Sequence, residues 1–302
     1  MRSVPASKAD SEVMQPITHY ENFPVASWLC PPALRAPIAA IYHYARTADD
    51  LADEGDAHAD QRLADLTEYR ADLLAASAWA ALDAQQRAAQ PLSPSQRWPQ
   101  VFGQLAAVMV SHALPLNLLD DLLDAFAQDV RKTAKGEGYE TQTELLDYCR
   151  RSANPVGRLL LHLYGVHHEA ALRMSDDICT ALQLINFWQD LSVDIPRGRH
   201  YLTQEARHKH GAHAADIEVQ RLTPAVVALI AEQTALARTL MLRGAPLVHL
   251  VSGRAGWELR LVVQGGLRIL DKVQALQGHN LTHRPQLKAW DVPLMLGRAL
   301  VM

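Results

Sequence analysis

The residues Asp49-Asp50-Leu51-Ala52-Asp53 form one acidic cluster, and Asp190-Leu191-Ser192-Val193-Asp194 form a second one in the other half of the chain. Successive residues of an α-helix are rotated by about 100°, so the aspartates of each cluster share one face of a helix. Like charges at this spacing weaken an isolated helix, and no base is interleaved with them. Each cluster therefore predicts a helix that presents carboxylates to a positively charged ligand.

Crowded carboxylate oxygens suit Mg²⁺, which takes one or two carboxylates from the protein and completes its shell with water and phosphate. Two such faces, if they oppose each other, would hold a diphosphate through bridging ions. The sequence therefore predicts Mg²⁺ as the cofactor, with Asp49, Asp50, Asp53, Asp190 and Asp194 as candidate ligands.

The composition favours a helical protein with a large core. The chain has 302 residues, 49% of them hydrophobic, and β-branched runs are scarce. No strand-like alternation or fixed repeat is apparent. We expect one all-α domain over residues 1–302, with 1–16 as a flexible tail. Helices are expected near 33–53, 60–84, 99–111, 116–132, 142–149, 155–164, 176–194, 224–242 and 258–274.

Several functional classes are disfavoured. A net charge of −4 without a basic stripe argues against nucleic-acid binding. The three cysteines lack metal-ligand spacing and are expected to be buried thiols in a reducing compartment. With no signal peptide and no run of about 18 apolar residues, we expect a cytoplasmic protein. The stretch 290–302 fits either packing onto the protein body or peripheral contact with a membrane.

Polar side chains surround both clusters. Arg46 precedes Asp50 by one helical turn, as a diphosphate ligand or as a simple ion pair. After the helix-breaking Pro196, a glycine-bearing turn carries guanidiniums and a phenol suited to phosphate oxygens. Upstream of Asp190, side chains at three- and four-residue spacing form a polar stripe in an apolar helix, and a buried stripe needs partners. These additional candidates are Arg197, Arg199, Tyr201, Gln183 and Asn186.

Three other clusters of acidic or histidine residues have structural rather than functional interpretations. Asp120-Asp121-Leu122-Leu123-Asp124 repeats the acidic spacing, but its leucines indicate an ordinary amphipathic helix with a solvated acidic side. Asp176-Asp177 follows Ser175, which suggests a helix start. The histidines at 208, 210 and 213 lie in a polar segment that we interpret as a solvated loop rather than a metal site.

Taken together, these motifs resemble the squalene and phytoene synthase family of head-to-head isoprenoid synthases. The segments 19–27 (HYENFPVAS), 45–50 (ARTADD) and 186–190 (NFWQD) are most similar to its hydroxysqualene synthase branch, found beside bacterial hopanoid pathways. The resemblance extends from His19 to about Lys272. It implies an isoprenoid synthase type helical barrel around a central apolar cavity, with the two aspartate-rich helices facing each other at its mouth.

The resemblance also implies presqualene diphosphate as substrate, Mg²⁺-assisted loss of diphosphate, and a cyclopropylcarbinyl cation sheltered by aromatic walls. Candidates for those walls are Phe23, Tyr44, Tyr148 and Trp188, with core packing as the alternative for each. Asn186 would join the aspartates as a metal ligand. The expected catalytic residues are Asp49, Asp53, Asp190, Asp194, Tyr148 and Asn154. The expected substrate-binding residues are His19, Phe23, Arg46, Gln183, Gln189, Arg197, Arg199 and Tyr201.

Departures from the family pattern bear on the product. Where the resemblance implies Arg and Glu, this chain has Gln189 and Val193, and Asn154 enters a place that is usually apolar. We hypothesise that Asn154 orients the water that captures the cation. No GxGxxG motif follows a strand, which favours water over hydride capture and hence hydroxysqualene as product. Gly265-Gly266 either makes room for substrate or allows close helix packing.

Three alternatives remain. A condensing enzyme would join two prenyl diphosphates, giving presqualene diphosphate or phytoene, with the same residues. A chain-elongating synthase would have a fuller second Asp-Asp-x-x-Asp motif, and a noncatalytic helical scaffold would not need the intact carboxylates and arginines. In the hopanoid setting we expect two functional partners, a synthase that supplies the substrate and a flavin-dependent reductase.

Overall fold

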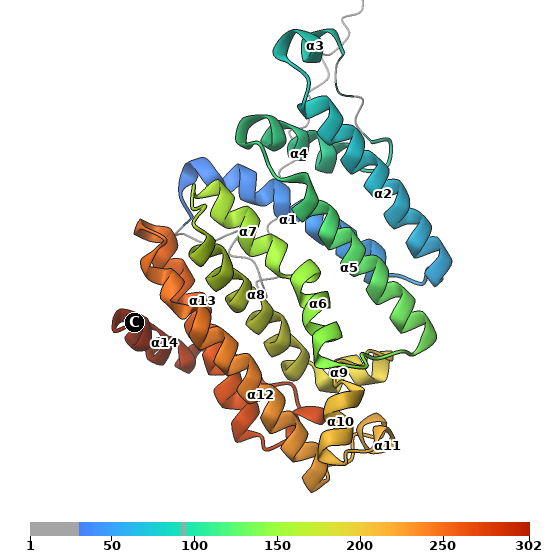
Figure 1. The fold of residues 1–302 in the computed structure, drawn as a ribbon, viewed down its shortest axis with the longest axis vertical. Helices are drawn as coiled ribbons and strands as arrows, with labels where there is room; N and C mark the ends of the chain where they lie inside the picture. The colour runs from blue at the N-terminus through green and yellow to red at the C-terminus, as the bar shows by residue number, and fades with distance from the viewer. Residues whose placement is uncertain (1–29, 91, 93–94) are drawn as a thin grey trace, which may run out of the picture.

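The computed structural model describes residues 30–90, 92 and 95–302, and all regular elements in these ranges are helical (Figure 1). This confirms the predicted all-α fold. The tail 1–16 and the candidate residues His19 and Phe23 lie outside the described residues.

The helices are as follows: α1 (Pro32–Asp53), α2 (Ala59–Ala80), α3 (Ala84–Ala89), α4 (Pro99–His112), α5 (Leu116–Lys135), α6 (Gln142–Ser152), α7 (Asn154–Leu163), α8 (Glu169–Gln189), α9 (Leu191–Asp194), α10 (Gln204–His210), α11 (Ala214–Glu218), α12 (Pro224–Gly244), α13 (Gly253–Ala275) and α14 (Val292–Leu300). Short 3₁₀ turns are η1 (Ile195–Arg197), η2 (Ala245–His249), η3 (His279–Leu281) and η4 (Ala289–Asp291).

Most helix starts follow local signals. Proline occupies the first turn of α1, α4, α7 and α12, where its missing N–H is not needed. Thr141, Thr203 and Thr223 cap α6, α10 and α12 through hydrogen bonds from backbone N–H groups. Helix α3, which was not among the expected helices, begins at a capping box formed by Asp83 and Gln86.

The interpretation of Asp176-Asp177 as a helix start is wrong. Helix α8 begins at Glu169, so both aspartates lie within it and are held by arginines of neighbouring helices. Arg158 of α7 binds Asp176 at 2.6 Å, and Arg243 of α12 binds Asp177 at 2.5 Å. These pairs bind α8 to its neighbours. The histidine segment is partly helical as well, and His210 of α10 bonds to Glu232 of α12 at 2.8 Å.

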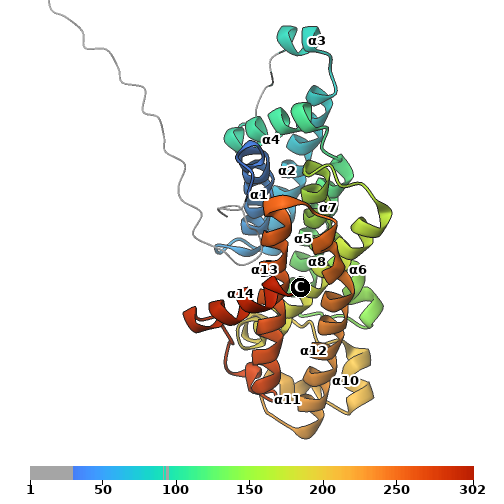
Figure 2. The same cartoon turned by 90° about the vertical axis from the view of Figure 1, so that its left-hand side faces the viewer.

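The core consists of two hydrophobic clusters. Helices α6, α8, α12 and α13 supply most of one, and α1, α2, α4 and α5 most of the other, with α7 packing against both α8 and α5 (Figures 1 and 2). Tyr44 and Trp188, proposed as cavity walls, are fully buried within these clusters, so for them the packing alternative is confirmed.

Helix packing also explains Gly266. A Cβ there would lie 2.8 Å from Met241 Cε and 3.1 Å from Ile185 Cδ1, so the missing side chain lets α13 approach α12 and α8 closely. The packing alternative therefore applies to this glycine.

In the described chain, one stretch, Pro224–His249, is long and apolar enough to cross a membrane by length and composition. Such a candidate span was not expected from the sequence, because charged residues divide the stretch into apolar runs shorter than about 18 residues. Its helix α12 packs against α8, and its charged residues Glu232, Arg238 and Arg243 all form ion pairs with neighbouring helices. Such contacts are those of a core helix.

Candidate active site

A cavity of about 1090 Å³ lies where α1, α5, α6, α7, α8 and α9 meet. This volume is at the upper end of the range of small-molecule pockets. Its lining combines apolar side chains with carboxylates, guanidiniums and amides. The apolar lining includes Ala45, Leu122, Phe126, Val130, Tyr148, Val156, Leu182 and Phe187, and the polar lining includes Arg46, Asp49, Asp53, Asp129, Gln183, Asn186, Asp190, Asp194, Arg197, Arg199 and Tyr201.

Helix α1 supplies the first carboxylate face. Arg46 Nη1 donates to Asp49 Oδ2 at 3.1 Å and Arg46 Nη2 lies 2.8 Å from Asp50 Oδ1, so the ion-pair interpretation of Arg46 is realised. Asp49 and Asp53 line the cavity; Asp50 is not in the lining. Burial raises the pKa of Asp49 despite the opposing effect of Arg46. Burial disfavours the charged form of this carboxylate, and a cation that binds beside it would offset that cost.

The second face comes from the end of α8 and from α9, and Arg199 joins it to the first. The Arg199 guanidinium contacts Asp53 of α1 and lies 3.8 Å from Asp194 Oδ1. Gly198 adopts a left-handed conformation (φ 76°) that ends η1 and brings Arg199 back towards both aspartates. The two acidic clusters, distant in sequence, therefore meet across the cavity.

Asp129 of α5 is a third carboxylate at this place, and the sequence analysis missed it. Burial and the negative charge of Asp49 raise its pKa to about 6. Burial, together with the charges of Asp190 and Asp129, raises the pKa of Asp194 to about 7. Three helices therefore bring negative charge into a poorly solvated space, an arrangement that costs stability until positive charge binds.

Aromatic rings form part of the cavity wall. Tyr148 lines it as expected, and Phe187 and Tyr201 stack at 3.7 Å between ring centroids. The Tyr201 hydroxyl lies 3.4 Å from Asp129 Oδ1. Tyr201 was expected to bind phosphate; its ring also belongs to the wall.

Gln189 points away from the cavity. Its side-chain amide donates to the Pro285 carbonyl at 2.8 Å and so anchors the segment that carries Arg284. Arg284 forms a bidentate pair with Asp190, with Nη2–Oδ2 at 3.2 Å. Arg284 therefore supplies a guanidinium to Asp190 from a segment 94 residues away, a contact that no local signal in the sequence could reveal.

Asn154 does not belong to the cavity lining, although Ala153 and Val156 do. It is buried, and its side-chain oxygen accepts a 2.9 Å hydrogen bond from Thr180 of α8. In this structure the amide therefore ties α7 to α8. The water-orienting hypothesis lacks support from this placement.

The donor set fits Mg²⁺ in the presence of a diphosphate. Among the described residues, no group of three or more His, Cys, Asp or Glu side chains converges on one metal position. Instead the carboxylates pair with Arg46, Arg199 and Arg284. Because Mg²⁺ commonly takes only one or two carboxylates and shares phosphate oxygens, a site completed by substrate needs no such group in the protein alone.

A signal for Asp129 was present in the sequence. Asp129 follows Leu122 by seven residues and Phe126 by three, so an acid sits on the apolar face of an amphipathic helix. Phe126 and Leu182 also line the cavity, but their pattern alone does not distinguish a cavity wall from a core.

Comparisons with known proteins agree with this geometry. The squalene/phytoene synthase family model matches residues 18–291. The chain is 32% identical to a hydroxysqualene synthase of Rhodopseudomonas palustris, covering 87% of this chain and 83% of the relative, and 30% identical to a phytoene synthase of Thermus thermophilus, covering 94% and 89%.

Among solved structures, the crystal structure of a squalene synthase from Alicyclobacillus acidocaldarius is similar, with a TM-score of 0.73 and 34% identity. The similarity covers 87% of this chain and 90% of that one. The resemblance read from the motifs is thus confirmed, and the protein belongs to the squalene/phytoene synthase family.

Proposed function

We propose that the protein converts presqualene diphosphate and water into hydroxysqualene and diphosphate. The observation that carries the proposal is the contact of Arg199 with both Asp53 and Asp194, which brings two carboxylate faces and a guanidinium together in a large cavity that also has an extensive apolar lining. A long hydrocarbon diphosphate matches both halves of this site. The name and extent of the hydroxysqualene synthase relative support the choice of reaction.

Ionisation of the substrate breaks the bond between carbon and the diphosphate oxygen, and the electron pair leaves with the diphosphate. Asp49, Asp53, Asn186, Asp190 and Asp194 would hold Mg²⁺, which supplies Lewis-acid polarisation of the leaving group when bound. Arg197 and Arg199 line the cavity beside them and stabilise the charge that develops on the leaving oxygens. Arg46 neutralises the outer side of the first face.

The carbocation remains in the apolar part of the cavity. The rings of Tyr148 and Phe187 present π faces that stabilise a cation without bonding to it. After the cyclopropane ring opens, a water oxygen forms the new bond to carbon and one proton is released.

The second candidate is condensation of two prenyl diphosphates. It is favoured by the phytoene synthase relative, which matches 94% of this chain, and by a cavity with room for two hydrocarbon chains. The same carboxylates would then bind both diphosphates.

The two candidates predict different products. Purified protein with Mg²⁺ is incubated with presqualene diphosphate or with farnesyl diphosphate, without NADPH, and the lipids are identified by mass spectrometry. We expect an alcohol with the squalene skeleton from presqualene diphosphate alone. A new diphosphate or a hydrocarbon from farnesyl diphosphate would instead assign the chain to the condensing branch.

A further inference from the structure

The C-terminal helix α14 has its apolar face turned outward. Its inner side carries Asp291, Met295 and Ala299, of which Asp291 and Ala299 are buried. Its outer side is mostly apolar, with Arg298 as the charged exception. Leu300 and Trp290, which lies just before the helix, are each 69% exposed. We name these outer residues the α14 face: Trp290, Val292, Leu294, Leu296, Leu300 and Val301.

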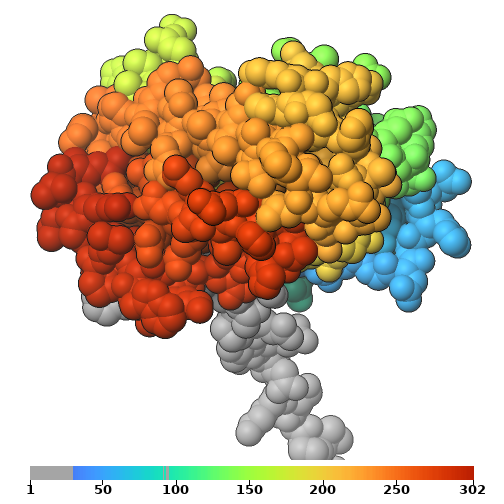
Figure 3. All heavy atoms as spheres, turned by 90° about the horizontal axis from the view of Figure 1, so that it is seen from below, coloured from blue at the N-terminus to red at the C-terminus, as the bar shows by residue number. Residues whose placement is uncertain are grey.

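The inner contacts hold this orientation firmly. Asp291, at the start of the helix, binds Arg268 and Lys272 of α13, each at 2.7 Å. At the other end, Arg260 of α13 donates to the Ala299 carbonyl at 3.2 Å. Turning the apolar side chains inward would break these pairs, so the α14 face stays on the outside of the molecule. Figure 2 shows α14 projecting from one side of α13, and Figure 3 shows the dark red C-terminal residues at one edge of the lower end.

Such a contiguous apolar surface is unusual on a helix face that is exposed to water. Scattered exposed leucines need no explanation, but here the residues at 292, 296 and 300 repeat every turn, and 294 and 301 flank them. The face therefore fits an apolar partner.

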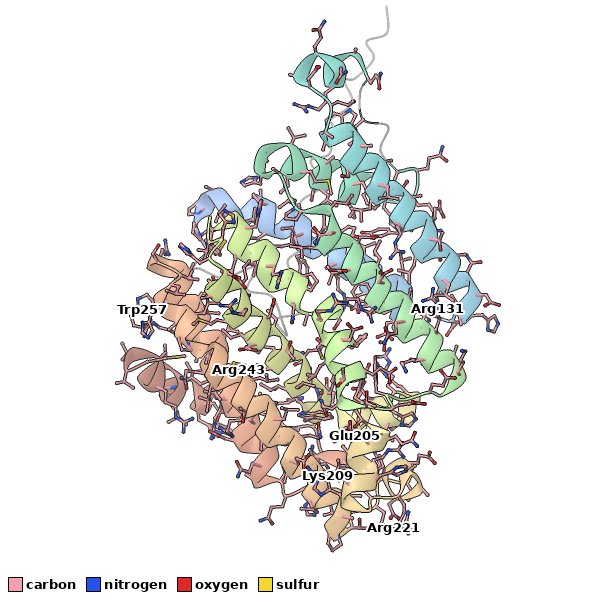
Figure 4. All side chains as sticks on the ribbon, viewed as in Figure 1. Arg131, Glu205, Lys209, Arg221, Arg243 and Trp257 are labelled. Carbon is pink, nitrogen blue, oxygen red and sulfur yellow. The ribbon has the colours of Figure 1, made fainter. Side chains whose placement is uncertain are left out.

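Charge and aromatic content identify the partner. Residues 284–302 contain the bases Arg284, Lys288 and Arg298 and a single acid, the buried Asp291. Arg284 pairs with Asp190 and Arg298 pairs with Asp271 at 3.0 Å, so Lys288 is the base that supplies positive charge beside the α14 face. The Lys288 ammonium lies 4.9 Å from the centre of the Trp290 ring. The exposed Trp257, which Figure 4 shows pointing outward from α13, lies beneath Arg260 at 5.2 Å, and Arg260 contacts the end of α14. Tryptophan with neighbouring bases around aliphatic side chains is typical of surfaces that enter the headgroup region of an anionic bilayer.

The face is also continuous with the site. Arg284, which binds Asp190, precedes Leu287 by three residues, and Leu287 approaches the position of a Gly265 side chain on α13. One short segment therefore joins the Arg284–Asp190 pair to α14.

We propose that the α14 face docks the protein onto anionic membranes, with Trp290, Leu294, Leu296 and Leu300 entering the bilayer and Lys288 contacting lipid phosphates. This inference uses only the surface and does not depend on the proposed reaction. A bilayer is also where a water-insoluble isoprenoid substrate or product resides.

The test is cosedimentation of the full chain with vesicles of phosphatidylcholine, with and without phosphatidylglycerol. We compare wild type, Leu296→Glu/Leu300→Glu, and the matched control Leu74→Glu/Leu242→Glu, whose leucines are similarly exposed on α2 and α12. Wild type and control should bind the anionic vesicles, and the α14 variant should bind about tenfold more weakly or worse. Lys288→Gln should weaken binding only where phosphatidylglycerol is present.

Wild type that remains in solution with both vesicle types, or an α14 variant that binds like wild type, would overturn the proposal. So would a wild-type dimer, detected by light scattering, that the α14 substitutions dissociate while no form binds vesicles, because the occupant would then be a second copy. Turnover of detergent-solubilised presqualene diphosphate serves as a separate control. It should be equal in wild type and the α14 variant, and its absence in both would count against the proposed reaction alone.

Discussion

Two neighbouring helices carry the same pattern of aspartates, Asp49-Asp50-x-x-Asp53 on α1 and Asp120-Asp121-x-x-Asp124 on α5, but their surroundings differ. On α5, Arg70 of α2 binds Asp120 at 2.9 Å and also contacts Asp124, at a half-exposed surface. On α1, Asp49 and Asp53 line a cavity opposite Asp194 and Asp129. The aspartate pattern marks an acidic helix face in both helices. What distinguishes α1 is that carboxylates of other helices line the same cavity as its own aspartates.

The largest difference between the two patterns should appear on neutralisation. Asp53→Asn and Asp194→Asn should each lower kcat by about 10²–10³-fold, because each removes a carboxylate from the proposed Mg²⁺ site that would stabilise the developing negative charge. Asp124→Asn, the matched control, should retain activity within about twofold, since exposed ion pairs contribute little. Steady-state rates and circular dichroism measure both. Equal losses of kcat for the variants of both helices would show that the two aspartate patterns do not differ in function.

Asp129 offers a comparison within a single helix, because Asp129 and Asp124 both lie on α5 but face different environments. Asp129→Asn should weaken activation by Mg²⁺ about 10–100-fold. It should also stabilise the metal-free protein to heat, because a buried carboxylate beside Asp49 is neutralised. A Mg²⁺ titration of rate and a thermal melt give the two readouts. A lower melting temperature with unchanged Mg²⁺ dependence would assign Asp129 a purely structural role.

The same dependence on surroundings applies to Asn154. Since its amide accepts from Thr180, Asn154→Ala should cost about 1 kcal/mol of unfolding free energy and leave the product unchanged. Thr180→Val, which removes the donor, should cost a similar amount. If Asn154→Ala instead alters the ratio of alcohol to hydrocarbon while Thr180→Val leaves that ratio unchanged, the result would support the hypothesis that Asn154 orients the water.

The smallest expected effect is on pH dependence. Burial raises the pKa of Asp194 to about 7, above its unfolded value near 3.9, so the folded state binds the proton more tightly. The stability of the metal-free protein should therefore fall as pH rises from about 4 to about 7. Asp194→Asn should flatten this slope in chemical denaturation series, whereas Asp120→Asn should not. A stability that rises over this interval, with a slope unaltered by Asp194→Asn, would contradict the account of crowded carboxylates.

The helices and the two acidic faces could be predicted from sequence because their signals are local. Proline at helix starts, apolar periodicity and the spacing of Asp49, Asp53, Asp190 and Asp194 each lie within a few residues. Arg284 could not be predicted, since its contact with Asp190 spans 94 residues. For Tyr44 and Trp188 the sequence left cavity wall and core packing open, because a core aromatic and a wall aromatic share the same sequence pattern. Asp129 was missed although its place on an apolar helix face was visible.

The central claim, capture of the cation by water in this cavity, is tested most directly with isotopically heavy-oxygen water. Protein and Mg²⁺ are mixed with presqualene diphosphate in this water, without a reductant, and the product is analysed by mass spectrometry. We expect a squalene-skeleton alcohol that carries the heavy oxygen and is lost in Asp53→Asn. An alcohol without the label, or a hydrocarbon as the main product, would contradict capture of the cation by water.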